Sequence, residues 1–160
     1  QVVFQEVEVF SGDSRTSLTE EHSVLADLLP GRNYSVSVFA LSNGVESLPV
    51  AKYVLTKPAS PIFEELQPIQ GGLNVSWKSD VTSKQAGYAI IYTRNDTGVP
   101  VTRLTEDAHV LLEDLYPGAG YEIKVYAISQ AELWSEPHVY FQAICKYHPD
   151  ILGGLPFNEK

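Results

Sequence analysis

The chain has 160 residues, which is room for one large domain or two small ones. Apolar residues make up 44 % of it, with nine Tyr, six Phe and two Trp, so a packed core is expected and disorder is disfavoured. The formal net charge of -9 repels phosphates and disfavours nucleic acid as a partner, and no apolar run reaches the roughly 18 residues of a membrane span.

Strands rather than helices are predicted along the chain. Residues 34–40 alternate apolar and polar side chains, as a strand does when one face packs on a core and the other meets water. Asn43-Gly44 predicts a tight hairpin turn, and the two prolines within 56–61 predict a short, semi-rigid connection. Further strands are expected near 61–67, 72–78, 87–94, 99–104, 108–113, 120–129 and 137–145.

Two parts of the sequence repeat each other. Segments 25–34 and 112–121 share Leu, Asp, Leu, Pro, Gly and Tyr at matching positions. The spacing of about 90 residues is the size of one small sandwich domain rather than of a solenoid repeat. We therefore expect two tandem copies of one fold.

Each copy carries the same turn, in which a Leu precedes Pro-Gly and a Tyr follows. These residues are Leu28, Pro30, Gly31 and Tyr34 in the first copy and Leu115, Pro117, Gly118 and Tyr121 in the second. Proline fixes φ and glycine permits a positive φ, so the pair predicts a tight turn. We expect the Leu to point into the core and the buried Tyr to bond nearby backbone through its hydroxyl.

The pattern Leu-x-Pro-Gly-x-x-Tyr-x-apolar-x-Val-x-Ala resembles the fibronectin type III domain at its E–F corner and strand F. Trp77, which follows Leu73 and Val75, resembles the strand-B tryptophan of that family. Residues 88–92 resemble its strand C, and 58–61 its Pro-rich start of strand A. The resemblance implies an all-β architecture of tandem immunoglobulin-like sandwiches, with seven strands in each complete domain.

The two copies differ in completeness. We expect a partial domain over 1–57 with strands C to G, a complete domain over 58–145, and a tail or the start of a further segment over 146–160. In the first copy, residues 1–5 fall on strand C, and strands A and B are missing. The N-terminus has neither a start Met nor a basic region before an apolar core, so we expect an internal fragment that begins inside a domain.

Three sites fit the N-glycosylation pattern Asn-x-Ser/Thr, at Asn33, Asn74 and Asn95. Such glycans require passage through the secretory lumen. Three sites in a short chain therefore favour a protein that is secreted or exposed on the extracellular side of the plasma membrane.

Two further side chains allow two interpretations each. Cys145 is the one cysteine, which excludes a disulfide scaffold within the chain. We expect it to pair with another chain or outside the fragment, or to be an inert thiol, with reactive chemistry as the alternative. Trp134 is expected to pack near the last strand, and the alternative is an exposed binding residue in the loop at 130–135.

No catalytic constellation is predicted. The four histidines have no metal-ligand spacing, and no Gly-x-Ser-x-Gly motif or phosphate-binding loop is found. We expect no enzyme activity in this chain, no metal and no cofactor.

Binding and spacing are the functions that remain. The segment is expected to mediate protein–protein contacts in the ectodomain of a cell-surface receptor. Its Leu-Pro-Gly-Arg-Asn-Tyr run resembles repeats of receptor-type tyrosine phosphatases, whose catalytic domain would lie elsewhere. The alternatives are spacer repeats of a secreted matrix or adhesion protein and an accessory module of a secreted enzyme. No nucleic acid and no direct membrane contact is expected.

Overall fold

A computed structural model describes residues 2–6, 14–17, 24–69 and 71–145, and within them the fold is all-β. The first repeat contains β1 (Val2–Glu6), β2 (Ser14–Ser17), β3 (Asn33–Val38), β4 (Leu41–Ser42), β5 (Val45–Glu46) and β6 (Val50–Leu55). The second contains β7 (Ile62–Ile69), β8 (Gly72–Lys78), β9 (Gly87–Arg94), β10 (Pro100–Thr105), β11 (His109–Leu112), β12 (Gly120–Ile128) and β13 (His138–Ala143).

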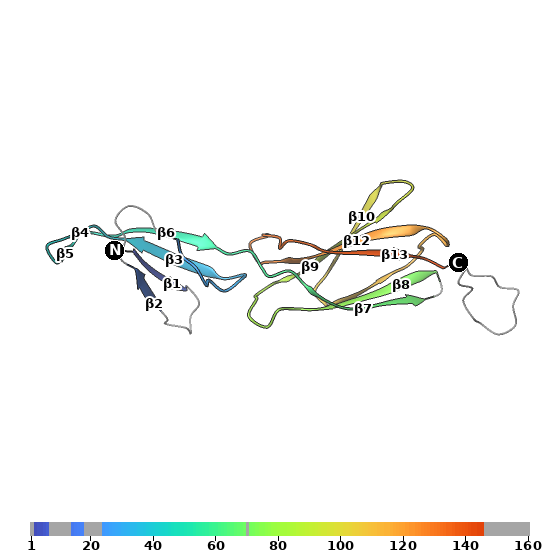
Figure 1. The fold of residues 1–160 in the computed structure, drawn as a ribbon, viewed down its shortest axis with the longest axis horizontal. Coiled ribbons are helices and arrows are strands. Elements are labelled where there is room, and N and C mark those ends of the chain that lie inside the picture. The colour runs from blue at the N-terminus through green and yellow to red at the C-terminus, as the bar shows by residue number, and fades with distance from the viewer. Residues whose placement is uncertain (1, 7–13, 18–23, 70, 146–160) are drawn as a thin grey trace, which may run out of the picture.

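The second repeat is a two-sheet sandwich of seven strands, the number expected for a complete domain (Figure 1). One sheet has the order β11-β8-β7 and the other the order β10-β9-β12-β13, and neighbouring strands pair antiparallel. Alternation explains the packing of the central strands: odd positions of β8 and β12 are buried, and the positions between them are less covered. The seven predicted strands agree with these bounds to within two residues.

The core of the second repeat lies between its two sheets. Its members are Leu73, Val75, Trp77, Tyr88, Ile90, Tyr92, Leu112, Leu115, Tyr121, Ile123, Val125, Ala127, Tyr140 and Ile144. Trp77 is 1 % exposed and meets the ring of Tyr88 edge-on at 5.1 Å between centroids. The expected strand-B tryptophan is thus a central part of this core.

Both Pro-Gly turns have the same construction. The backbone N–H of Leu29 donates to Tyr34 Oη at 2.8 Å, and that of Tyr116 donates to Tyr121 Oη at 2.9 Å. In each copy the bond reaches back five residues and joins the strand to its preceding turn.

The first repeat presents a single larger sheet of order β2-β1-β3-β6 and the small hairpin β4–β5, which turns at Asn43 and Gly44. Within residues 24–57 Tyr34 is the one fully buried large apolar side chain. Leu28 is half-buried, whereas its counterpart Leu115 is buried. Alignment with β11 places strand E of the first repeat at 22–25, where 22 and 23 lie outside the described residues and 24 and 25 form no strand.

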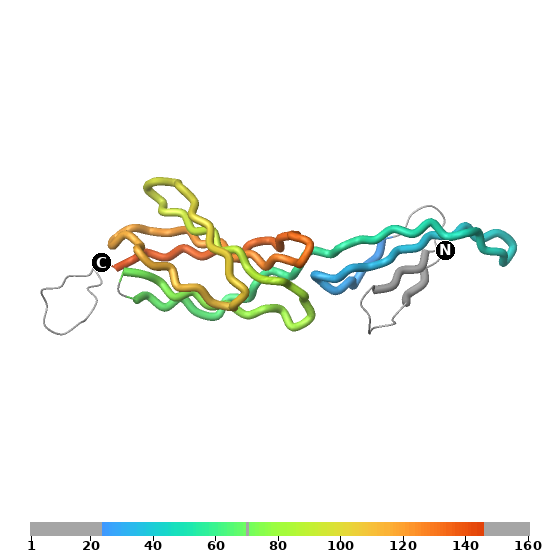
Figure 2. Tube along the Cα trace, turned by 180° about the vertical axis from the view of Figure 1, so that it is seen from behind, coloured from blue at the N-terminus to red at the C-terminus, as the bar shows by residue number. Residues whose placement is uncertain are grey.

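The two repeats follow one another along the long axis of the molecule (Figures 1 and 2). Residues 56–61 connect β6 to β7, and Pro58 and Pro61 are buried at the start of the second repeat. The predicted tail at 146–160 lies outside the described residues.

Candidate functional site

The two repeats meet where the B–C loop of the second, residues 79–86, packs on the Pro-Gly turn of the first. The backbone N–H of Lys84 donates to the carbonyl of Pro30 at 3.3 Å. An Arg32 guanidinium N–H donates to the carbonyl of Thr82 at 3.2 Å. The B–C loop therefore forms part of the contact between the repeats.

Gly31 is the closest point of that contact. Its φ of +69° lies in the left-handed region, which glycine adopts without strain. A Cβ added to it would lie 1.9 Å from the carbonyl oxygen of Lys84, so a side chain here requires the backbones to separate. Gly98 has a matching φ of +66°, but a Cβ added to it would meet no atom within 4 Å. The turn geometry alone therefore does not create the crowding at Gly31.

The connecting segment is anchored to the same turn. Thr56 Oγ1 donates to the carbonyl of Leu29 at 2.7 Å and accepts from the N–H of Arg32 at 2.9 Å. Farther along, the N–H of Ala59 donates to Ser83 Oγ at 2.9 Å, and Lys57 forms an exposed ion pair with Glu136 at 3.0 Å. Backbone hydrogen bonds thus restrict the connection more than the surface ion pair does.

The B–C loop holds its own shape through Asp80. The carboxylate accepts from the backbone N–H of Thr82 at 2.7 Å and from its hydroxyl at 2.5 Å. The Thr82 hydroxyl bond, and then its backbone bond, lower the pKa of Asp80 below its usual value. The charged carboxylate therefore fixes the loop that carries the docking backbone.

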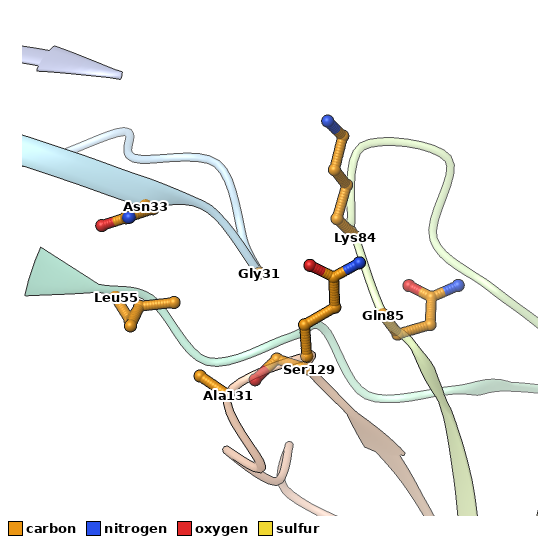
Figure 3. A pocket seen from close by; sticks show the side chains of 8 residues that line it. Gly31, Asn33, Leu55, Lys84, Gln85, Ser129 and Ala131 are labelled. Carbon is orange, nitrogen blue, oxygen red and sulfur yellow. The ribbon is translucent and has the colours of Figure 1, made fainter. Parts of the chain in front are cut away.

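A hollow of about 420 Å³ opens beside the docking point (Figure 3). Asn33 and Leu55 line it from the first repeat, and Gln85, Ser129 and Gln130 line it from the second. Amides, a hydroxyl and Lys84 supply its polar groups beside Leu55 and Ala131, so it suits a polar ligand better than an apolar one.

The outer face of the β10-β9-β12-β13 sheet carries an exposed apolar surface. The ladder register places Leu104, Ile91, Tyr126, Val139 and Phe141 on this one face. Phe141 is 70 % and Leu104 71 % exposed, while a Glu122–Lys124 ion pair at 2.6 Å lies among them. We call this set, together with Trp134, the outer apolar face.

Trp134 lies at the edge of the outer apolar face. It bridges Ile128 in an isolated β-pairing, and its ring packs on Tyr126 at 5.2 Å between centroids. It nevertheless keeps 38 % of its surface exposed. The geometry gives this residue a packing contact and leaves part of the indole open to a partner.

The three predicted glycosylation sites lie in different surroundings. Asn95 is exposed in the turn between β9 and β10. Asn74 is half-buried on the outer face of the three-stranded sheet, opposite Gln67 and Leu111. Asn33 begins β3 at the junction, where it is half-buried.

Cys145 is an exposed thiol just beyond β13, and within the described ranges no disulfide includes it. Over the same ranges no group of three or more His, Cys, Asp or Glu gathers as metal ligands do. No helix in the described part of the chain is long and apolar enough to cross a bilayer.

The family profile of the fibronectin type III domain matches residues 58–140, which is more than half of the chain. The chain belongs to the fibronectin type III family. The matched range covers β7 to β12 and the first part of β13.

Solved structures with the same tandem arrangement resemble this chain. A two-domain fibronectin type III segment of chicken tenascin has a TM-score of 0.65 at 20 % identity, covering 89 % of this chain and 82 % of that one. Domains d3–d4 of the rat CD45 extracellular region have a TM-score of 0.53 at 19 % identity, covering 85 % and 78 %. At these identities the likeness concerns the fold.

A curated relative is the mouse receptor-type tyrosine-protein phosphatase eta, from Mus musculus. It is 25 % identical over 113 residues, which are 69 % of this chain and 9 % of that protein. The chain thus spans less than a tenth of the relative's length.

Sequence reasoning missed both the contact between the repeats and the outer apolar face. The run Val139-Tyr140-Phe141 was the available signal for the outer apolar face, because apolar residues occupy both sides of one strand there. The docking of Gly31 on Lys84 had no local signal, because it depends on the orientation of two repeats.

Proposed function

We propose that this chain is an extracellular binding and spacing segment of a cell-surface receptor ectodomain. It contacts a protein partner, and the parent protein carries any catalytic activity elsewhere. Membership of a non-catalytic domain family and the three glycosylation patterns support this assignment. The similarity to a receptor-type tyrosine phosphatase makes such a receptor the favoured parent.

The outer apolar face is the observation that carries the binding function. Soluble domains rarely leave several large apolar side chains exposed on one sheet face unless a partner covers them. Phe141 on the edge strand β13 and Trp134 beside Tyr126 are the aromatic type that dominates protein interfaces. The partner is therefore expected to be a protein with an apolar patch rather than a charged polymer.

A cell-binding experiment tests this function. The soluble chain, clustered on a multivalent carrier, is titrated onto cells, and saturable binding is expected. Phe141→Glu should weaken that binding at least about tenfold, because a carboxylate would be desolvated in the interface. Val99→Glu, at an exposed position in the β9–β10 turn, is the matched control and should bind as the parent does. Equal loss in both variants, or no saturable binding to any cell type, would contradict the proposal.

The docked junction favours a second candidate, a spacer of fixed geometry in a matrix or adhesion protein. Spin labels at Ala51→Cys and Thr102→Cys in a Cys145→Ser background report the distance between the repeats. Gly31→Ala should broaden that distance distribution, because its Cβ collides with the Lys84 carbonyl. Gly98→Ala imposes the same backbone strain in open space and should leave the distribution narrow. An unchanged distribution in Gly31→Ala would argue against a fixed spacer.

A further inference from the structure

The hollow between the repeats has an N-glycosylation acceptor, Asn33, in its lining. It has a volume of about 420 Å³, within the range of roughly 300–1,000 Å³ that proteins use for small organic ligands. Asn33 Oδ1 is buried and has no hydrogen-bond partner among the described residues. Buried carbonyl oxygens of this kind are nearly always bonded, so this atom is an exception.

Asn33 is also a glycosylation acceptor, followed by Tyr34 and Ser35. Neither of the other two acceptors lines this hollow, since Asn95 lies at an exposed turn and Asn74 on the outer face of a sheet. One residue therefore combines the modification pattern with a place in the lining of a hollow of suitable size.

We propose that an N-linked glycan is attached to Asn33 and that its first sugar, an N-acetylhexosamine, occupies this hollow. The inference rests on the proposed extracellular placement, which supplies the modifying machinery. The donor is an oligosaccharide joined through C1 to a polyprenyl diphosphate. Asn33 Nδ2 forms a bond to C1 and loses one proton, while the C1–oxygen bond to the diphosphate breaks and the polyprenyl diphosphate leaves.

The lining of the hollow offers polar groups to a sugar. From the second repeat, Gln130 offers an amide donor and acceptor, and the Ser129 hydroxyl, which accepts the N–H of Leu133, has its own proton to donate. The Gln85 amide nitrogen donates to Tyr88 Oη at 3.1 Å. The attached sugar reaches these groups from the first repeat, so it bridges the two repeats beside the Gly31–Lys84 contact. The glycan thereby becomes part of the junction and restricts the angle between the repeats.

Enzymatic deglycosylation tests the position of the sugar. The chain, given a leader, is produced through the secretory pathway of a mammalian cell, and each acceptor is scored by glycopeptide mass spectrometry. Peptide N-glycosidase should release the Asn95 glycan from the native protein. It should release the Asn33 glycan at least about tenfold more slowly until the protein is unfolded.

Variants at Ser35 test the bridge. Ser35→Ala removes the acceptor pattern without changing Asn33, and Ser35→Thr keeps it. In the background labelled at residues 51 and 102, the distance distribution should broaden for Ser35→Ala and stay narrow for Ser35→Thr. Thr97→Ala, which removes the Asn95 glycan, is the control and should leave it narrow.

Each contrary outcome identifies what is wrong. An unmodified Asn33 beside a modified Asn95 overturns the inference and leaves the extracellular placement intact. A modified Asn33 whose glycan is released as quickly as that of Asn95 shows a sugar outside the hollow, which also overturns it. Absence of glycan at all three acceptors contradicts both the inference and the extracellular placement.

Discussion

The same strand pattern has different surroundings in the two repeats. In the second repeat, Val125 on β12 is 0 % exposed beneath the β11-β8-β7 sheet. In the first, its counterpart Val38 on β3 is 47 % exposed. Tyr34 and Tyr121, by contrast, are buried to almost the same extent, at 4 % and 6 % exposed.

The difference separates local from non-local stabilisation. The tyrosine hydroxyl bonds a backbone group five residues away, so the turn forms with or without an opposing sheet. Burial of the valine requires strands from elsewhere in the fold, which the described residues of the first repeat do not supply. The turn is thus a local unit, and the core is a property of the whole sandwich.

The largest expected effect is the removal of the core of the second repeat. Trp77→Ala should lower the free energy of unfolding by about 3–5 kcal/mol, because it leaves a large cavity between the sheets. Urea unfolding followed by circular dichroism measures the change. Trp134→Phe is the control, with an expected loss below about 1 kcal/mol, because the ring is partly exposed and remains aromatic. A similar loss in both variants would contradict the assignment of Trp77 to the core.

Substitutions of the equivalent valines Val125 and Val38 test the difference in burial between the two repeats. Val125→Ala should cost about 2 kcal/mol, from lost burial and the remaining cavity. Val38→Ala should cost less than about 1 kcal/mol, because half of that side chain is already in water. Hydrogen exchange measured for peptides of β3 and β12 reports each repeat separately. Equal costs would show that the first repeat has an opposing sheet of its own.

The sequence predicted strands and turns well because their signals are local. Period-two alternation located β8 and the resemblance to strand C located β9, both to the residue, and Pro-Gly located both turns. The sequence did not reveal that Asp27 and Asp114 each adopt a φ of 57°, because a positive φ is uncommon for any residue other than glycine.

The junction and the outer apolar face were not predictable in the same way. Gly31 reads as an ordinary turn glycine, and only its distance to Lys84 shows a second role. Phe141 reads as a core residue of a strand, and the register of β13 against β12 shows that it faces outward. Both properties depend on pairings between residues distant in sequence.

The tyrosine turns should respond equally in the two repeats. Tyr34→Phe and Tyr121→Phe each remove a hydroxyl that accepts a backbone N–H, with an expected cost of about 1 kcal/mol. The amides of Leu29 and Tyr116 should lose protection against hydrogen exchange in the corresponding variant. A much larger effect at Tyr121 than at Tyr34 would show that the turn depends on the opposing sheet after all.

The smallest effect concerns Tyr140, whose ladder position is occupied by the exposed Lys52 in the first repeat. Burial raises the pKa of Tyr140 from 10.0 to about 12, and its hydroxyl has no partner among the described residues. A folded-state pKa above the unfolded value leaves stability intact below pH 10 and lowers it as the pH rises toward 12.

Tyr140→Phe should therefore unfold like the parent, or at slightly higher urea, at pH 7, because the substitution removes an unpaired buried hydroxyl. Between pH 10 and 12 the variant should lose less stability than the parent, since the titrating group is absent. Urea midpoints at pH 7, 10 and 11.5 measure the difference. Lys52→Met in the first repeat is the matched control and should leave the alkaline loss of the second repeat unchanged. Parallel pH profiles for parent and Tyr140→Phe would show that the hydroxyl is accessible to water, as Lys52 is.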